Sequence, residues 1–196
     1  MRTPYYESTI HKQIREKREN RKERIRSDLE LYGADVLQSD EMRQAYDQTH
    51  HNWSTLGEHT IRVAMSSVMI CYALKKLNIK VNIPLVVIAS LCHDLGMLDR
   101  GKFSSMKESN LEHPKESVSV AKDIVKDLPE GAESIIERHM WPIGESEAPD
   151  SLEGAIVSVA DKYNAVKDIV KGSEVKNTSV KSYVQNEKEK LLERLK

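Results

Sequence analysis

The sequence predicts an all-α fold, and three observations support this prediction. No stretch shows the strict polar–apolar alternation that half-buried strands require. Aromatic residues make up only 5% of the chain, with a single Phe, so the core must consist of Val, Ile, Leu, Met and Ala. Several apolar runs repeat with helical spacing between Gly and Pro residues that can end or begin helices. With 196 residues, the chain is long enough for one domain with a sizeable core.

The charge balance and the cysteines limit the expected partners and compartment. The formal net charge is -1, so bulk charge gives no reason to expect a nucleic acid or an anionic membrane as partner. Cys71 and Cys92 both lie in apolar runs, which favours buried, reduced thiols over a disulfide or a metal role. The N-terminal segment lacks the apolar core of a signal peptide, and the longest apolar stretches are too short to span a bilayer. We therefore expect a cytoplasmic protein.

The N-terminal part is predicted to be helical and highly charged. Residues 8–30 carry acids and bases in alternation, which suits a solvated helix with a thin apolar stripe. A basic patch for RNA is conceivable, but the interspersed Glu residues favour a helix that contacts a partner or wraps the domain. A second helix is expected over about 35–47. In the polar loop 48–55 that follows, Ser54 or Thr55 can cap the next helix, with a Glu near the capping-box position.

Five core helices are expected after this loop. Pro84 opens the second of them, which is apolar all round and therefore central, and Gly96 can end it. Residues 97–113 lack periodicity and are interpreted as a loop, so that Pro114 opens the third helix. Gly172 is expected to end the fifth helix, before a polar and then charged helical tail. The predicted helices span residues 58–77, 84–96, 114–128, 132–140 and 151–170.

Polar residues stand at or near the ends of these helices, or on their apolar faces. An ionised carboxylate in an apolar helix costs several kcal/mol unless it is paired or binds a cation, and Asp94 and Asp161 are both in this position. A single His at a helix end is more often a cap, and a lone buried Asp can cap a neighbouring helix. Their joint occurrence favours a metal site, because imidazole and carboxylate together bind transition metals. The candidate ligands are His59, His93, Asp94, His113, His139 and Asp161.

This ordered set resembles the HD superfamily of metal-dependent phosphohydrolases. The resemblance covers about residues 50–170 and includes the local sequence around each candidate ligand. It is closest to a bacterial branch with HMWP-like and ADK-like segments. The segments that carry it are LGEHTIRVA, ASLCHDLG, EHPKESV, ERHMWPI and IVSVADKYNAV.

The resemblance implies an HD-domain helical bundle with a metal centre. Carried over position by position, it assigns His59, His93, Asp94 and Asp161 to a first divalent ion. Asp94 would bridge to a second ion held by the two remaining histidines, and Asp94 and His93 would be the catalytic pair. The implied reaction is hydrolysis of a phosphoester by a metal-bridging hydroxide. The ions would be divalent transition metals, two per chain, with Mn, Fe, Ni, Co and Zn all compatible with His and Asp ligands.

Two departures from the cyclic-dinucleotide phosphodiesterases of the superfamily argue against that substrate. Those enzymes carry a Gly-Tyr-Pro segment and a Lys three residues after the His-Asp doublet, whereas this chain has HMWPIGES and Met97. Trp53 and Trp141 flank the expected site and could stack on a base, although packing anchors are the commoner role. For each candidate phosphate or substrate contact the alternative is a solvated or structural side chain. These candidates are Arg62, Arg100, Lys102, Lys107, Lys162 and His51.

The expected organisation is a charged helical segment over 1–49, the HD domain over 50–172, and a charged tail over 173–196. Two functions from different classes fit the sequence. The first is a phosphohydrolase acting on a small phosphoester such as a nucleotide. The second is a non-catalytic metal- or nucleotide-binding sensor or interaction module. A third possibility, a purely structural bundle, would leave the buried acids unexplained. The expected partner is a small phosphorylated metabolite or nucleotide, with no membrane and no nucleic acid, and the terminal helices could form a homo-oligomer.

Overall fold

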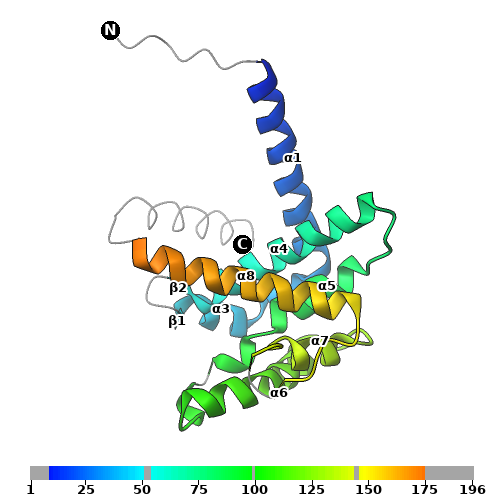
Figure 1. The fold of residues 1–196 in the computed structure, drawn as a ribbon. Coiled ribbons are helices and arrows are strands. Elements are labelled where there is room, and N and C mark those ends of the chain that lie inside the picture. The colour runs from blue at the N-terminus through cyan, green and yellow to red at the C-terminus, as the bar shows by residue number, and fades with distance from the viewer. Residues whose placement is uncertain (1–8, 51–53, 99, 144–145, 175–196) are drawn as a thin grey trace.

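The computed structural model describes residues 9–50, 54–98, 100–143 and 146–174, and it confirms the all-α prediction. Helices surround a central apolar helix, while the first helix projects from the bundle at its N-terminal end (Figure 1). No helix of the described part is both long and apolar enough to cross a bilayer. The elements are α1 (Thr9–Tyr32), α2 (Ala34–Gln38), α3 (Asp40–Asp47), β1 (Thr49–His50), β2 (Ser54–Thr55), α4 (Leu56–Lys76), α5 (Ile83–Cys92), η2 (Leu95–Met97), η3 (Arg100–Lys102), α6 (Met106–Ile124), α7 (Ala132–Arg138) and α8 (Leu152–Glu174).

The helix α5 forms the centre of the core, as its all-round apolar sequence predicts. Val86, Val87, Leu91 and Cys92 are fully buried, and α5 packs against α1, α4, α7 and α8. Each such side chain contributes about 1.5–3 kcal/mol when it leaves water. The hydroxyl of Ser90 donates to the Val86 carbonyl within the same helix, so this buried polar group is satisfied. The central helix is therefore held by apolar packing along most of its length.

The helix α4 begins where its sequence predicts. The Thr55 side chain accepts from the Glu58 backbone N–H, and the Glu58 carboxylate accepts from the Thr55 N–H, which completes a capping box. This cap fixes the first turn of α4, which carries His59. Both cysteines, Cys71 in α4 and Cys92 in α5, are buried free thiols.

Two predictions in the N-terminal third are wrong in detail. The expected second helix is interrupted at Ser39, whose side chain accepts from the Met42 N–H and so caps a new helix, α3. The expected loop 48–55 contains a two-residue antiparallel pair in which Thr49 lies opposite Thr55. Strand pairing this short leaves no periodicity in the sequence.

The largest error concerns α6, which begins at Met106 and not at Pro114. Ser105 caps it by accepting from the Glu108 N–H, and Pro114 lies inside the helix. His113 therefore stands in the middle of a helix, not in front of one. The buried face of α6 is polar across the predicted boundary: Ser109 and His113, within the predicted loop, and Ser117, within the predicted helix, are all buried at helical spacing.

The two glycines that were expected to end helices do not do so. The helix α5 already ends at Cys92, and Gly96 lies in η2. A Cβ on Gly96 would come within 2.4 Å of both the His113 carbonyl oxygen and the Ser117 nitrogen, so glycine is needed there for space. Gly172 lies within α8, and among the described glycines only Gly131 has a positive φ. The predicted tail over 173–196 lies outside the described residues, apart from its first two positions in α8.

Candidate metal centre

Five helices bring the six predicted ligands together at one point. His59 lies in the first turn of α4, His93 directly follows α5, and His139 directly follows α7. Asp94 follows His93 in the chain, and His113 and Asp161 lie in the middle of α6 and α8. All six side chains are buried: His59, His93, Asp94, His113, His139 and Asp161.

The first group of ligands surrounds one oxygen of Asp94. Its Oδ2 lies 3.4 Å from His93 Nε2 and 3.8 Å from His59 Nε2. Asp161 Oδ1 lies 3.0 Å from His59 Nε2 and 3.7 Å from His93 Nε2. Two imidazole nitrogens and two carboxylate oxygens therefore converge, which is a suitable donor set for one divalent transition metal.

The second group surrounds the other oxygen of the same carboxylate. Asp94 Oδ1 lies 3.4 Å from His113 Nε2 and 3.3 Å from His139 Nε2. The two Nε2 atoms are 3.3 Å apart. His59, His93 and Asp94, and separately Asp94, His113 and His139, have ligand atoms within 4.8 Å of one another. Asp94 thus presents one oxygen to each pair of histidines.

Backbone carbonyls orient three of the four imidazoles. His93 Nδ1 donates to the Ser90 carbonyl at 2.8 Å, His113 Nδ1 to the Ser109 carbonyl at 2.6 Å, and His139 Nδ1 to the Ile136 carbonyl at 2.7 Å. A proton on Nδ1 leaves the Nε2 lone pair of a neutral ring directed at the cluster.

The donor set fits a metal ion better than it fits a hydrogen-bond network. Within the described chain, His93 Nε2 is buried without a hydrogen-bond partner. His113 Nε2 and His139 Nε2 face each other, although neither can donate when both rings carry their proton on Nδ1. A buried polar atom without a partner costs about 1–3 kcal/mol. A divalent cation would satisfy all of these lone pairs together.

One functional residue, Asp168, was missed by the sequence analysis. Its Oδ2 accepts from His59 Nδ1 at 3.2 Å and from Arg62 Nη2 at 2.7 Å, and the residue is buried. A carboxylate behind a ligating imidazole fixes the ring and raises its basicity. The signal was available in the sequence, because residues seven apart lie on the same face of a helix and Asp168 follows Asp161 by two turns.

The carboxylates strongly alter the ionisation of the imidazoles. Burial by itself would lower the pKa of His59, but hydrogen bonds to Asp161 and Asp168 outweigh it and raise that pKa to about 9. Burial likewise opposes ionisation of Asp94 and Asp161, yet the neighbouring histidines hold both pKa values well below the usual range. Without a metal, imidazolium protons therefore supply the positive charge that the two buried acids require.

A cavity of about 510 Å³ opens onto this cluster. Its polar wall includes four of the ligands together with Lys162, whose Nζ donates to Asp161 Oδ2 at 2.7 Å and to the His139 carbonyl at 3.1 Å. Further polar groups come from the N-cap and the first half of α6, as Ser105, Ser109 and Asn110. The remaining lining residues are apolar: Met97, Phe103, Met140, Ile143 and Ala165.

The other predicted substrate contacts do not line this cavity, or lie outside the described residues. Arg62 holds Asp168 and faces a different groove. Lys102 is exposed, with its Nζ 3.9 Å from Glu116 Oε2. The side chain of Arg100 and the whole of His51 and Trp53 lie outside the described residues. Trp141 is partly exposed and is not among the cavity residues.

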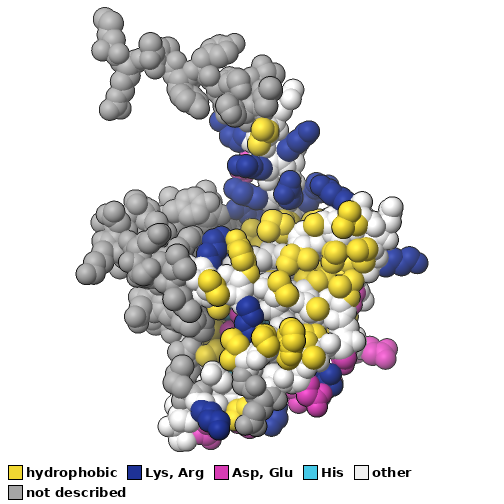
Figure 2. Space-filling model, viewed as in Figure 1, with side chains coloured by type: hydrophobic (Ala, Val, Ile, Leu, Met, Phe, Trp, Pro, Cys, Tyr) yellow, Lys and Arg dark blue, Asp and Glu magenta, His cyan; other side chains and the backbone are white. Residues whose placement is uncertain are grey.

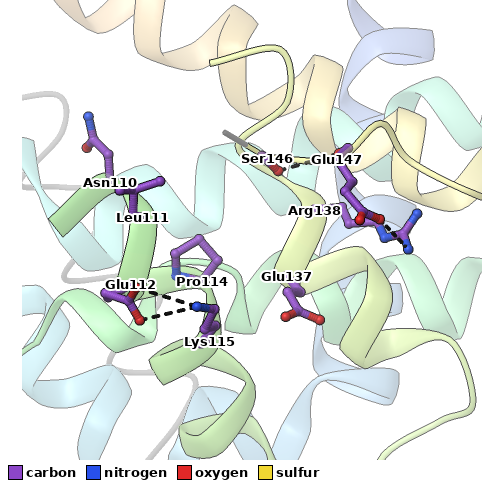
Figure 3. A pocket seen from close by; sticks show the side chains of 9 residues that line it. All are labelled: Asn110, Leu111, Glu112, Pro114, Lys115, Glu137, Arg138, Ser146 and Glu147. Atoms are coloured by element: carbon purple, nitrogen blue, oxygen red, sulfur yellow. Dashed lines mark hydrogen bonds and ion pairs between the residues drawn. The ribbon is translucent and has the colours of Figure 1, made fainter. Parts of the chain in front are cut away.

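A second pocket, of about 470 Å³, lies between α6, α7 and the segment that follows α7 (Figure 3). Four of its five charged side chains pair with one another: Lys115 Nζ lies 3.4 Å from Glu112 Oε2, and Arg138 Nη2 lies 2.9 Å from Glu147 Oε2. None of the six clustered residues lines it. We therefore assign the candidate site to the cavity over the cluster.

Comparison with known proteins agrees with this geometry. The family model described as HD domain matches residues 56–166, which is more than half of the chain and includes all six clustered residues. No curated protein and no solved structure matches the chain. HD domains form a superfamily of metal-dependent phosphohydrolases, and this chain belongs to the HD-domain family.

Proposed function

We propose that this protein is a phosphohydrolase with two divalent transition-metal ions, acting on a small phosphoester. The observation that carries the proposal is the position of Asp94, whose two oxygens face two separate pairs of imidazole Nε2 atoms. A carboxylate in this position can bridge two cations and offset the repulsion between them.

In this proposal the ligands divide into two sets that share Asp94. His59, His93 and Asp161 would complete the first set, and His113 with His139 would complete the second. A pair of divalent cations polarises phosphoryl oxygens and supplies hydroxide at neutral pH. The chain contributes the orientation, because backbone carbonyls and Asp168 fix the imidazoles before any ion binds.

The cavity lining supports a substrate that combines a phosphate with an organic group. Lys162 reaches the cavity beside Asp161 and can contact a phosphoryl oxygen as a point charge. The apolar wall, with Phe103, Met140 and Ile143, offers a surface for a nucleobase or a similar group. A cavity of about 510 Å³ lies in the range of small-molecule sites. A nucleotide-sized phosphoester is therefore the proposed substrate.

The test compares the wild-type protein with Asp94→Asn in metal content and in turnover. Asp94→Asn keeps the shape of the side chain but removes the charge that both ions would share. We expect about two transition-metal ions per wild-type chain, and a loss of phosphatase or phosphodiesterase activity on the order of a thousandfold in the variant. Asp123→Asn, at an exposed position on α6, is the matched control and should retain activity.

Three results would count against the proposal. If no metal binds even after reconstitution, the metal centre itself is refuted. If the Asp94→Asn protein keeps full activity, the doublet is not the source of that activity. If metal binds but no phosphoester in a panel of nucleotides and simple esters turns over with Mn, Fe, Ni or Co, the non-catalytic sensor replaces the enzyme.

A further inference from the structure

A basic groove separate from the metal cavity lies between α1, α4 and α8. It has a volume of about 400 Å³, and no residue lines both it and the cavity over the metal centre. Three helices supply its cations: Arg18, Arg21 and Lys22 come from α1, Arg62 from α4, and Lys167 from α8. None of the residues that line it is acidic. The groove therefore collects positive charge in a protein whose net charge is close to zero.

The charged residues with which α1 lines the groove are all basic, although acids and bases alternate along its sequence. At about 100° per residue, Arg18, Arg21 and Lys22 fall within an arc of roughly 100° on the face that lines the groove. The three acidic residues nearest to them in sequence, Glu16, Glu19 and Glu23, fall within roughly 60° on another side of the helix. In Figure 2, Lys and Arg side chains gather along α1 next to a band of hydrophobic side chains. The turns of α1 that line the groove therefore present basic side chains to it and no acidic ones.

Two arginines of α1 lie at the groove, Arg18 and Arg21. Arg18 and Arg21 are exposed, and the structure gives neither an ion pair among the described residues. Lys22 does pair, with its Nζ 3.2 Å from Glu19 Oε1, and Lys167 Nζ lies 5.3 Å from the centre of the Tyr163 ring. The two arginines thus retain donors that can bind phosphate in a planar, bidentate manner.

The walls of the groove restrict the class of ligand. Ile25, Met65 and Met69 line it with apolar surface, which an extended polyanion would not need. Cation donors from three helices around a cavity of about 400 Å³ suit a ligand with more than one phosphate and a compact organic group. We propose that this α1/α4/α8 groove binds a small polyphosphorylated ligand, of the nucleoside di- or triphosphate class, independently of the metal cavity.

Titration calorimetry of the full chain with ATP and with pyrophosphate, in the presence of chelator, tests the proposal. We expect one site per chain, with affinity that falls severalfold when the salt rises from about 50 to 300 mM. Arg18→Glu/Arg21→Glu should weaken binding at least about tenfold, because two charge-assisted hydrogen-bond donors are replaced by negative charges. Both positions are exposed on a helix surface, so the fold should be retained, and circular dichroism checks this.

The control variant Lys12→Glu/Lys126→Glu changes the net charge equally at exposed positions outside the groove, and should bind within about twofold of wild type. Equal weakening in the control would reduce the effect to net charge and overturn the proposal. So would absence of binding at about 1 mM ligand in low salt. Binding of an oligonucleotide without binding of ATP or pyrophosphate would instead indicate a nucleic-acid surface. ATP affinity that falls in Lys162→Met but not in Arg18→Glu/Arg21→Glu would place the ligand in the metal cavity.

Discussion

A side chain that binds no ion can still determine how well its neighbour does, and Asp168 is in this position. It accepts from His59 Nδ1 on one side and from Arg62 on the other, at 3.2 and 2.7 Å. Its own pKa is lowered in spite of burial, because of the hydrogen bond from His59 and the charge of Arg62. The carboxylate is therefore ionised at neutral pH and holds His59 in one orientation.

Replacing Asp168 with Asn removes this charge while keeping the shape of the side chain. We expect metal affinity to fall about 10–100-fold, the usual effect of losing a carboxylate behind a ligating histidine. Competition with a fluorescent chelator measures this affinity, and Asp123→Asn on the exposed face of α6 is the control. An affinity within twofold of wild type in Asp168→Asn would show that Asp168 does not orient His59.

At the scale of helices, the contact between η2 and α6 positions the second set of ligands. The Gly96 N–H donates to Ser117 Oγ at 2.9 Å, and the Gly96 Cα faces the backbone of α6 at His113. The doublet and His113 are thus brought together by a backbone contact that only glycine permits. Because backbone atoms form this contact, a rotamer change cannot relieve a clash there.

We expect Gly96→Ala to be strongly destabilising. Its Cβ would lie 2.4 Å from both the His113 oxygen and the Ser117 nitrogen, so α6 must shift. The free energy of unfolding should fall by about 1–3 kcal/mol, the usual cost of overpacking, and metal content should drop toward one ion per chain. Urea unfolding and elemental analysis measure the two effects, with Ser119→Ala on the exposed face of α6 as control. Unchanged stability and metal content would refute this role for Gly96.

The errors of the sequence-based prediction have identifiable physical causes. The periodicity of α4, α5 and α8 is visible because their buried faces are apolar, and the ligands stand out against that background. The buried face of α6 carries Ser109, His113 and Ser117, since it borders the metal cavity and η2. Its helical pattern is therefore polar and resembles a loop. Asp168 escaped notice because only acids within apolar runs were considered, and its partner His59 is distant in sequence.

Across the whole molecule, the buried acids and imidazoles make stability depend on pH when no metal is bound. The pKa of His59 is raised from 6.5 to about 9, so its contribution is fully present below pH 6.5 and is lost as the pH rises through 9. His93 has a raised pKa and acts in the same direction, through the charges of Asp94 and Asp161. The lowered pKa values of these two acids contribute stability above about pH 4 that is lost on acidification.

The metal-free protein should therefore be more stable at pH 6 than at pH 9. Between pH 6 and 9 we expect its free energy of unfolding to fall by roughly 3 kcal/mol. Because bound metal requires neutral imidazoles, metal affinity should rise over the same interval. Urea titrations of chelated and Mn-loaded protein at several pH values measure both trends. Equal stability of the chelated protein at pH 6 and 9 would contradict the ionisation described for His59.

Arg62 connects the metal centre with the α1/α4/α8 groove, because it donates to Asp168 and also lines the groove. A guanidinium has a fixed, planar set of donors. A phosphate that contacts Arg62 from the groove therefore changes the hydrogen bond that Arg62 donates to Asp168. Asp168 holds His59, and through this chain of three side chains an anion outside the metal cavity would alter metal affinity. Thermodynamic linkage makes the coupling reciprocal: the metal would change the affinity for the anion by the same factor. Occupancy of the metal centre could then be measured outside the metal cavity, as a change in anion binding at the groove.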